Sequence, residues 1–509
     1  MNQYLLQKIQ KLFVFFIIIF LPFTNFPKKF SLSFIENNAS YYIMLILIAL
    51  FLFEYFKYKF KINKIIFTFF IIYVLSQIIS LVHGLIIYPY YNIIDLSQLP
   101  KLQYICDRFD ISVDKNIIGI YLFVRETKNI ILNSLTLCFL PLLFVHLFSN
   151  DWEKCFSFVA KSVVALVCLL CLYSIPEIIY LKFNNIFAQK ILETINPFLY
   201  DVGLAYNYWP PLLWNGLGGQ LRSLMPEPSH FSIVANFCIP FLLYFIYRTF
   251  SFKYIVLCAF FMFMLFMSKS RTGMLLFVIE NLILLSFFIF NFNKKNLKFL
   301  IVLFSCIFFS MLLNLTIPNK IDRDGLDRQT ISNNDDSKLV NYIDENLISV
   351  TNLNKGSSNN RFVIANAMLK VGLSNPFLGV GEGLRSAYIV DNIPEFEIKS
   401  EVQIWVNSFK EKGFKAVIPN FNQYVYFFAE NGLLGLILFI LPVIYIFYKI
   451  SKNKSLLLNF NFILILIAFI GQLVAMLAGR YLITYPVTLG LMFVCFDNMD
   501  NKKEKEKYE

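Results

Sequence analysis

Two cations, Lys269 and Arg271, stand in a short polar segment between two apolar runs, Met267-Ser268-Lys269-Ser270-Arg271-Thr272-Gly273. The gap is so short that the chain must turn back there in a tight hairpin. Arginine presents a planar fork of N–H donors that suits phosphate oxygens, and Gly273 permits a close backbone approach. The hairpin therefore predicts a site for an anionic ligand. The alternative is that both cations are anchors at helix ends, with their charges reaching the membrane surface.

A second candidate runs from Arg222 to His230, directly before the apolar run that begins at residue 231. Two prolines flank Glu227 and fix the local backbone, and Ser229 can cap the helix that follows. An acid held rigidly beside Arg222 and His230 is suited to be a general base or a substrate clamp. The alternative, which we weigh equally, is that these residues only mark the start of the helix and have no functional role.

Three further arginines are expected on the same side of the protein. Arg361 stands at the start of a predicted helix, Arg385 follows a glycine-rich turn, and Arg480 lies between two late apolar runs. We expect Arg222, Lys269, Arg385 and Arg480 to form a looser cationic rim that guides anionic headgroups. For Arg361 and Arg385, ordinary surface charge is the alternative.

Neither a metal nor a cofactor is expected. The three histidines of the chain are too few and too scattered for a zinc site. The triplet Asp322-Arg323-Asp324 matches the D-x-D pattern of metal-dependent glycosyltransferases, but more acids surround it and we interpret it as solvated loop. Trp209 and Trp214 could stack on a sugar ring, although anchoring at the membrane interface explains them as well.

The composition decides what must position these residues. Of the 509 residues, 58% are hydrophobic and only 15% are charged, and the mean hydropathy is +0.62. A soluble protein cannot bury that much apolar surface, so the chain is predicted to be an all-α integral membrane protein. The net charge of +12 does not indicate nucleic-acid binding, because most lysines and arginines lie in short runs between apolar segments.

About twelve apolar runs are long enough, or nearly so, to span a membrane. They lie near residues 9–24, 41–56, 65–88, 129–149, 157–180, 231–247, 254–268, 272–291, 299–316, 432–448, 456–476 and 481–497. With both termini in the cytoplasm, the basic loops fall on the inner side, as the positive-inside rule requires. The hairpin at 267–273 then lies on the outer side, where a short basic loop is unexpected.

This topology divides the chain into four parts. They are a bundle of about nine helices at 1–316 with outer loops near 89–128 and 182–230, a large periplasmic loop at 317–430, the last three helices at 431–498, and a charged cytoplasmic tail at 499–509. The large loop is expected to contain a helix from about residue 360, with Ile364, Met368 and Val371 on one face. Pro376 should end this helix, and a flexible turn should follow at 379–383.

Taken in order, these motifs resemble the O-antigen polymerase (Wzy-type) and O-antigen ligase superfamily. The resemblance covers roughly residues 205 to 440, and its order and spacing are more specific than any single motif. It rests on Met225-Pro226-Glu227-Pro228-Ser229-His230, Ser270-Arg271-Thr272-Gly273, Arg361, Asn375-Pro376-Phe377-Leu378-Gly379-Val380-Gly381, Asn422 and Glu430-Asn431-Gly432-Leu433-Leu434-Gly435.

The resemblance implies a GT-C-like, metal-independent, inverting glycosyltransferase that acts on undecaprenyl-pyrophosphate-linked glycans at the periplasmic face of the inner membrane. Arg271 and Arg361 resemble the family arginines that would engage the donor pyrophosphate. Ligase relatives usually carry a histidine directly before the asparagine of the late motif, whereas Phe421 stands there in this chain. This departure favours the polymerase and leaves the base unassigned; Glu227 is the first candidate and His230 the second.

We therefore predict a polymerase of O-antigen or capsule repeat units that works with the lipid bilayer and possible partners such as a chain-length regulator and a flippase. The first alternative is the ligase, which uses the same donor. The second is a lipid-linked oligosaccharide flippase or transporter. A transporter should carry charged residues inside its helices, facing a cavity, and the apolar runs of this chain are nearly free of charge.

Overall fold

The computed structural model describes residues 2–27, 30, 38–149, 151–200, 219–317, 356–393, 401–413, 416 and 418–508. Within these residues all of the regular secondary structure is helical. The D-x-D triplet and the two tryptophans at 209 and 214 lie outside them. The large loop is described only from residue 356 onward, with gaps.

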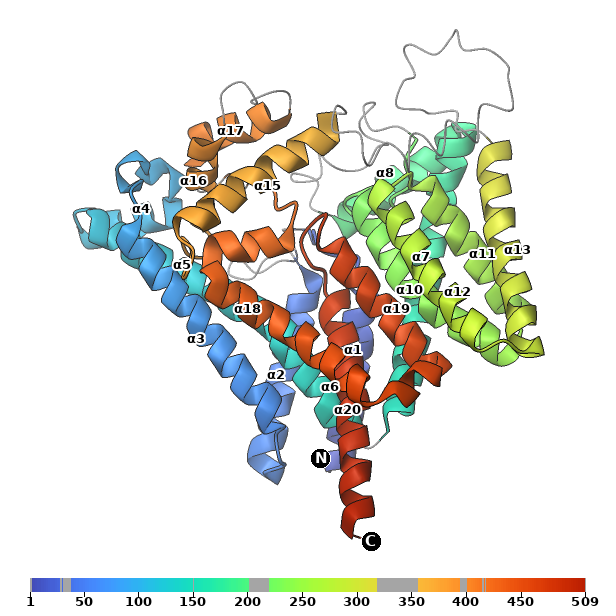
Figure 1. The fold of residues 1–509 in the computed structure, drawn as a ribbon. Helices are drawn as coiled ribbons and strands as arrows, with labels where there is room; N and C mark the ends of the chain where they lie inside the picture. Colours follow the sequence, from blue (N-terminus) through green and yellow to red (C-terminus); the bar gives the residue numbers. More distant parts are fainter. Residues whose placement is uncertain are drawn as a thin grey trace.

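The bundle is formed by helices that run back and forth between two ends of the molecule (Figure 1). They are α1 (Gln3–Ile19), α2 (Ala39–Tyr58), α3 (Lys64–Ile87), α5 (Lys115–Ser134), α6 (Leu140–Phe148), α7 (Trp152–Phe183), α10 (Pro228–Thr249), α11 (Phe252–Met267), α12 (Arg271–Phe290), α13 (Lys294–Thr316), α18 (Gln423–Lys452), α19 (Phe460–Ala475) and α20 (Thr484–Tyr508). Helices α4 (Pro100–Phe109), α8 (Ile186–Leu199), α15 (Gly356–Ser374), α16 (Arg385–Asn392) and α17 (Glu401–Lys412) complete the described elements outside the bundle.

Eight of the described helical stretches are long and apolar enough to cross a membrane, and α11 and α19 are shorter apolar helices. The protein is therefore a polytopic membrane protein. One stretch is longer than hydropathy predicts: α5 and α6 join through the π-helical turn Leu135–Phe139 into one span, Lys115–Phe148. Helix α5 carries charged residues such as Arg125 and Glu126, which lower the hydropathy of the sequence there. Part of the segment expected to be an outer loop near 89–128 is therefore helical.

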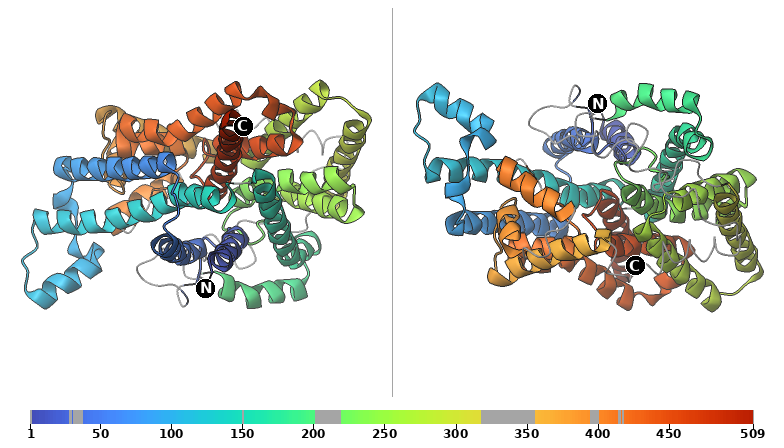
Figure 2. Two further views of the ribbon diagram at one scale, coloured as in Figure 1. Left: turned by 90° about the horizontal axis from the view of Figure 1, so that it is seen from below. Right: turned by 90° about the horizontal axis from the view of Figure 1, so that it is seen from above.

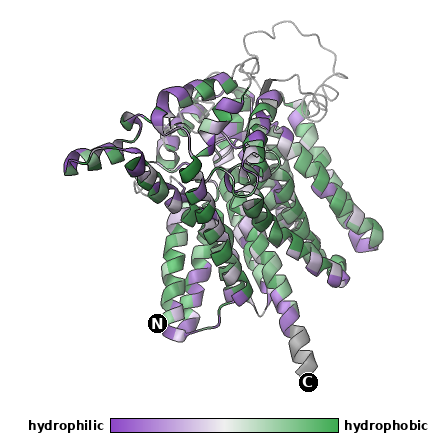
Figure 3. Ribbon diagram, turned by 60° about the vertical axis from the view of Figure 1, so that its left-hand side comes forward, coloured by the Kyte–Doolittle hydropathy of each residue, from purple (hydrophilic) through white to green (hydrophobic). Residues whose placement is uncertain are grey.

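Both termini lie at one end of the bundle, and α15, α16 and α17 lie at the other, which we call the distal end (Figure 1). Views along the bundle axis show α3 and α5 on one side of the molecule and the α10–α13 group on the other (Figure 2). Hydrophobic residues cover the bundle helices, while hydrophilic residues gather at the distal end (Figure 3). The largest core cluster joins α1, α6, α7, α10, α11, α19 and α20.

The helix expected within the large loop is present as α15. It begins at Gly356, a few residues earlier than predicted, and Ile364, Met368 and Val371 are fully buried on one face. These side chains pack with α16, α17 and the start of α18 in a separate small core. The loop thus forms its own helical layer, which holds its polar residues in fixed positions at the distal end.

Candidate active site at the distal end

The hairpin predicted from the sequence is present between α11 and α12. Lys269 adopts a left-handed backbone conformation with φ of +48°. Ser270 caps α12, because its Oγ accepts a hydrogen bond from the backbone N–H of Gly273 at 3.2 Å. Arg271 is the first residue of α12 and, like Lys269, is half-buried. Both cations therefore stand at the tip of the hairpin, as expected.

The start of α10 packs directly against this hairpin. The hydroxyl of Ser232 donates to that of Ser270 at 2.8 Å, and the side-chain amide of Asn236 donates to the carbonyl of Gly273 at 2.9 Å. A Cβ on Gly273 would lie 2.3 Å from that of Ser232, so only glycine permits this approach. Two helix N-termini, each with a partial positive charge, thus lie side by side with two cations. We call Lys269, Arg271, Glu227 and His230 the hairpin group.

Glu227 and His230 belong to this group by position. Glu227 precedes α10 as its N-cap residue, and Ser229, expected to be the cap, instead donates its hydroxyl hydrogen to the Glu227 carboxylate at 3.0 Å. Both Glu227 and His230 are half-buried. His230 has a buried Nδ1 with no hydrogen-bond partner in the described part of the chain. These residues remain candidates, and they stand beside the cations of the hairpin.

Arg222 does not lie on a rim, contrary to the expectation. Its side chain is 2% exposed, and the backbone N–H groups of Arg222 and Ser223 each donate to the carboxylate of Glu177 at 2.9 Å. Burial lowers the pKa of Arg222 to about 10, and the nearby Glu177 opposes this effect. These two backbone contacts hold the chain at residues 222 and 223 against α7, and the Arg222 side chain itself donates to the carbonyl of Pro226 at 3.3 Å.

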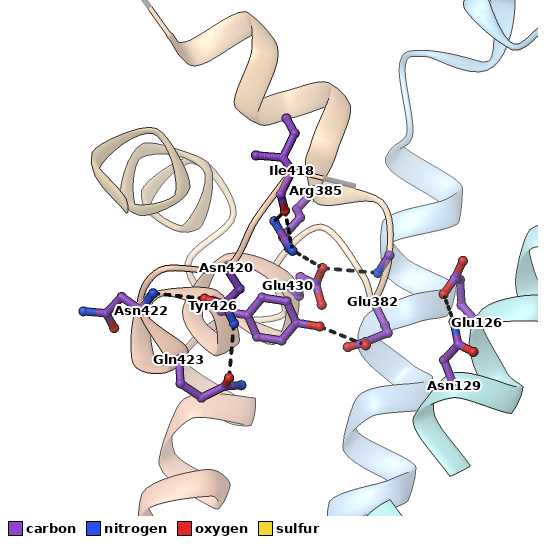
Figure 4. Close-up of polar contacts among 11 residues, drawn as sticks. Glu126, Asn129, Glu382, Arg385, Ile418, Asn420, Asn422, Gln423, Tyr426 and Glu430 are labelled. Carbon is purple, nitrogen blue, oxygen red and sulfur yellow. Dashed lines mark hydrogen bonds and ion pairs between the residues drawn. The ribbon is translucent and has the colours of Figure 1, made fainter. Parts of the chain in front are cut away.

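A second polar group forms where α18, α5 and the 376–384 segment meet (Figure 4). We call Glu126, Glu382, Glu430, Arg385 and Tyr426 the carboxylate group. Arg385 is also buried rather than on a rim: its Nε lies 2.9 Å from Glu430 Oε1, and its side chain is 6% exposed. The two terminal nitrogens of Arg385 donate to the carbonyl of Ile418 at 3.2 Å each.

The other members of this group have their own partners. The phenol of Tyr426 donates to Glu382 Oε1 at 2.9 Å. Glu126 lies 3.2 Å from Arg125 Nε and accepts from Asn129 at 2.8 Å. Within the described residues these carboxylates do not form a cluster that could hold a metal ion. They form instead a buried network in which two of the three acids are paired with arginines.

The carboxylate group lies where α18 is broken and the 376–383 segment bonds to it. Gly432 has φ of +62°, so the helix changes direction there and leaves backbone groups on both sides unpaired. The 376–383 segment satisfies them. Val380 and Gly381 donate to the carbonyls of Ala429 and Glu430 at 3.0 and 2.8 Å, and the N–H groups that follow the break donate to the carbonyls of residues 376 and 377. The turn at 379–383, expected to be flexible, is therefore fixed by backbone hydrogen bonds.

Replacing Gly84 with alanine tests how much the group depends on this segment. A Cβ on Gly84 of α3 would lie 2.0 Å from the carbonyl oxygen of Val380, so the 376–383 segment must move. We expect a loss of stability of about 1–3 kcal/mol, measured by unfolding in detergent. Gly479→Ala is the control, since its Cβ would meet nothing within 4 Å. A Gly84 variant that matches this control would show that the segment is not held against α3.

The two remaining predicted residues stand on other elements. Arg361 is half-buried on α15, with its guanidinium 5.4 Å from the centre of the Phe421 ring. Arg480 is exposed and donates to Asn133 Oδ1 at 3.0 Å, and it acts electrostatically on Tyr426. The closeness of Arg361 and Arg271, expected for two ligands of one pyrophosphate, stays a prediction.

The turn after α19 contacts helices that carry members of both groups. The backbone N–H of Gln423, at the start of α18, donates to the carbonyl of Met476 at 2.8 Å. On its other side, Ala475 packs with Ile233 of α10 and Leu276 of α12. Figure 1 likewise places the distal end of α19 between α15 and α18 on one side and α10 on the other. The two groups therefore flank this turn at the distal end.

The acids that complete these groups are Glu126, Glu177, Glu382 and Glu430, and none of them stands out in the sequence. The apolar runs predict bundle helices that are nearly free of charge. The structure corrects this, because Glu54 and Glu280 are also buried inside helices. A single acid hardly changes the hydropathy of a long apolar run, so a charge count hid them. An ionisable residue inside or beside such a run is the signal that would have found them.

Comparison with known proteins finds a family match that overlaps this part of the chain. A family model described as O-antigen ligase matches residues 254–440. The matched range contains the hairpin cations, Arg361 and most of the carboxylate group, but neither Glu227 and His230 nor Arg480. No curated protein matched the chain.

Proposed function

We propose that the protein is a polymerase of polysaccharide repeat units. The match of residues 254–440 to the family model described as O-antigen ligase supports an enzyme of this kind. The protein would transfer a growing glycan from undecaprenyl pyrophosphate to the non-reducing end of a lipid-linked acceptor repeat. The observation that carries this proposal is that the cationic hairpin and the carboxylate group both lie at the distal end of a membrane bundle. A cationic site suits a diphosphate, and a carboxylate suits an acceptor hydroxyl.

The proposed setting is the bacterial inner membrane, with both termini in the cytoplasm and the distal end in the periplasm. Twelve spanning helices in a GT-C-like arrangement agree with both termini lying at one end (Figure 1). Basic residues cluster at that end, as in the tail of α20 and the loop between α2 and α3. A chain-length regulator and a flippase are possible partners of such an enzyme.

The chemistry would be a metal-independent displacement with inversion at the anomeric carbon. Arg271, Lys269 and Arg361 would bind the pyrophosphate and offset the charge that develops on it as it leaves. Arg480, exposed at the same end, would guide anionic headgroups. Arg222 and Arg385 are buried and would act by fixing the segments around them. Glu227, and after it His230, are the base candidates within the hairpin group.

The polymerase is favoured over the ligase by one residue. Phe421 stands where ligase relatives carry their histidine, and its ring packs between Arg361 and Trp405, 5.4 Å from each. It offers no base for the transfer to a second kind of acceptor. The ligase remains the second candidate, because the matching family model bears that description.

A glycan banding pattern distinguishes these functions. In a strain that lacks the gene and is complemented with the wild-type protein, we expect a ladder of chain lengths where the deletion shows a single repeat attached. A deletion that instead accumulates lipid-linked polymer without attachment would favour the ligase. Accumulation of lipid-linked single repeats on the cytoplasmic side would favour a flippase.

A further inference from the structure

An inverting displacement restricts where its base can stand. The acceptor oxygen must approach the anomeric carbon from the side opposite to the leaving pyrophosphate, so the base that takes its proton also belongs on that opposite side. Glu227 and His230 stand at the start of α10, where Ser232 contacts Ser270 of the hairpin at 2.8 Å. They are thus close to Lys269 and Arg271, two of the three proposed pyrophosphate ligands. They are therefore on the side of the leaving group. The base is better sought in the carboxylate group, across the turn that follows α19.

Among the residues that the structure describes, Glu382 is the one acid of that group without a direct arginine partner. Glu430 is paired with Arg385 at 2.9 Å and Glu126 with Arg125 at 3.2 Å. Glu382 accepts a hydrogen bond from the neutral phenol of Tyr426 at 2.9 Å and is also hydrogen-bonded to the side chain of Glu430. Glu382 is also the most exposed of the three, at 6% against 1% for Glu430 and 2% for Glu126. It is thus the acid best placed to receive a proton from a substrate.

The backbone around Glu382 is built to hold it rigidly. Gly381 and Gly383, with φ of +88° and +76°, adopt conformations that favour glycine on both sides of it. The N–H of Gly383 donates to Glu430 Oε1 at 3.3 Å, and a Cβ on Gly383 would lie 2.5 Å from the Glu126 carboxyl carbon. Glu430 and Glu126 therefore pack against the backbone of Gly383, next to Glu382. The carboxylate of Glu382 itself points toward Tyr426 (Figure 4).

We infer that Glu382 is the general base that takes the proton from the acceptor hydroxyl. This inference rests on the proposed polymerase function. The acceptor oxygen forms a bond to the anomeric carbon, and the bond from that carbon to the pyrophosphate oxygen breaks, with its electron pair leaving on the pyrophosphate. The hydroxyl proton passes to the Glu382 carboxylate and from there to water. Glu430 and Arg385 act as positioning residues.

The test uses the full-length protein in nanodiscs with a purified lipid-linked repeat as both donor and acceptor. We expect Glu382→Gln to lower kcat by about 10²–10⁴-fold with KM changed only a few-fold. The control is Glu411→Gln, at an exposed acid of α17, with the wild-type rate. Glu227→Gln should lose less activity than Glu382→Gln; a greater loss would overturn the inference and leave the polymerase function standing.

A second variant guards against simple misfolding. In Glu382→Ala, added formate should restore part of the lost rate, because a small carboxylate can occupy the vacated space and accept the proton. A purely structural role would give no rescue, and absence of rescue in a variant that still binds the lipid-linked repeat would contradict the inference. If the wild-type protein itself forms no polymer from this substrate, the proposed function fails and the base assignment fails with it.

Discussion

Replacing Arg271 with alanine is expected to lower polymerisation by about 10²–10³-fold while the protein level in the membrane stays unchanged. Removing one donor to developing negative charge in a transition state costs about 2.7–4 kcal/mol. Arg271 is half-buried at the first position of α12, where the helix dipole adds to its charge. The measurement is the glycan ladder of a deletion strain complemented with the variant, which should show only single repeats.

Two further variants make this experiment specific. Arg271→Lys keeps the charge but loses the planar fork, so we expect a partial ladder rather than none. Lys253→Ala removes an exposed cation near the start of α11, at the opposite end of the bundle, and should leave the ladder unchanged. A full ladder from Arg271→Ala would mean that the hairpin cation is only a topological anchor, and the proposed mechanism would lose its main support.

Replacing Arg385 with methionine is expected to destabilise the protein by about 3–5 kcal/mol, because it leaves the buried carboxylate of Glu430 without its cation. Both side chains are nearly inaccessible, and the pair also orients Gly383 and the segment that carries Glu382. The measurement is the midpoint of unfolding in detergent, together with the amount of protein in the membrane. Lys410→Met, at an exposed cation of α17, is the matched control.

The double variant Arg385→Met, Glu430→Leu separates a buried charge from a lost contact. Removing both partners of a buried pair is often close to neutral, so this variant should recover much of the lost stability. It should not recover activity, since Glu382 would lose the neighbours that position it. An Arg385→Met protein as stable as the Lys410 control would show that water reaches Glu430 and that the pair is not buried in the working enzyme.

The sequence alone was sufficient for the features that depend on neighbouring residues. Hydropathy over windows of about 20 residues predicted a polytopic helical protein, and the short gap between two apolar runs predicted the hairpin at 267–273. The spacing of Ile364, Met368 and Val371 predicted the buried face of α15. Each of these predictions depends on the periodicity or charge of residues close together in the sequence, so it needs no knowledge of the tertiary structure.

Only the tertiary structure decided which residues lie next to each candidate. The sequence predicts Arg222 and Arg385 to be surface cations, but folding buries them near Glu177 and Glu430. Arg480 reaches Asn133 over a separation of 347 residues, and no local pattern encodes such a contact. The physical reason is that a charge in a membrane bundle is tolerated only where another part of the chain neutralises it, so the partner, and with it the role of each candidate, is set by how the helices pack.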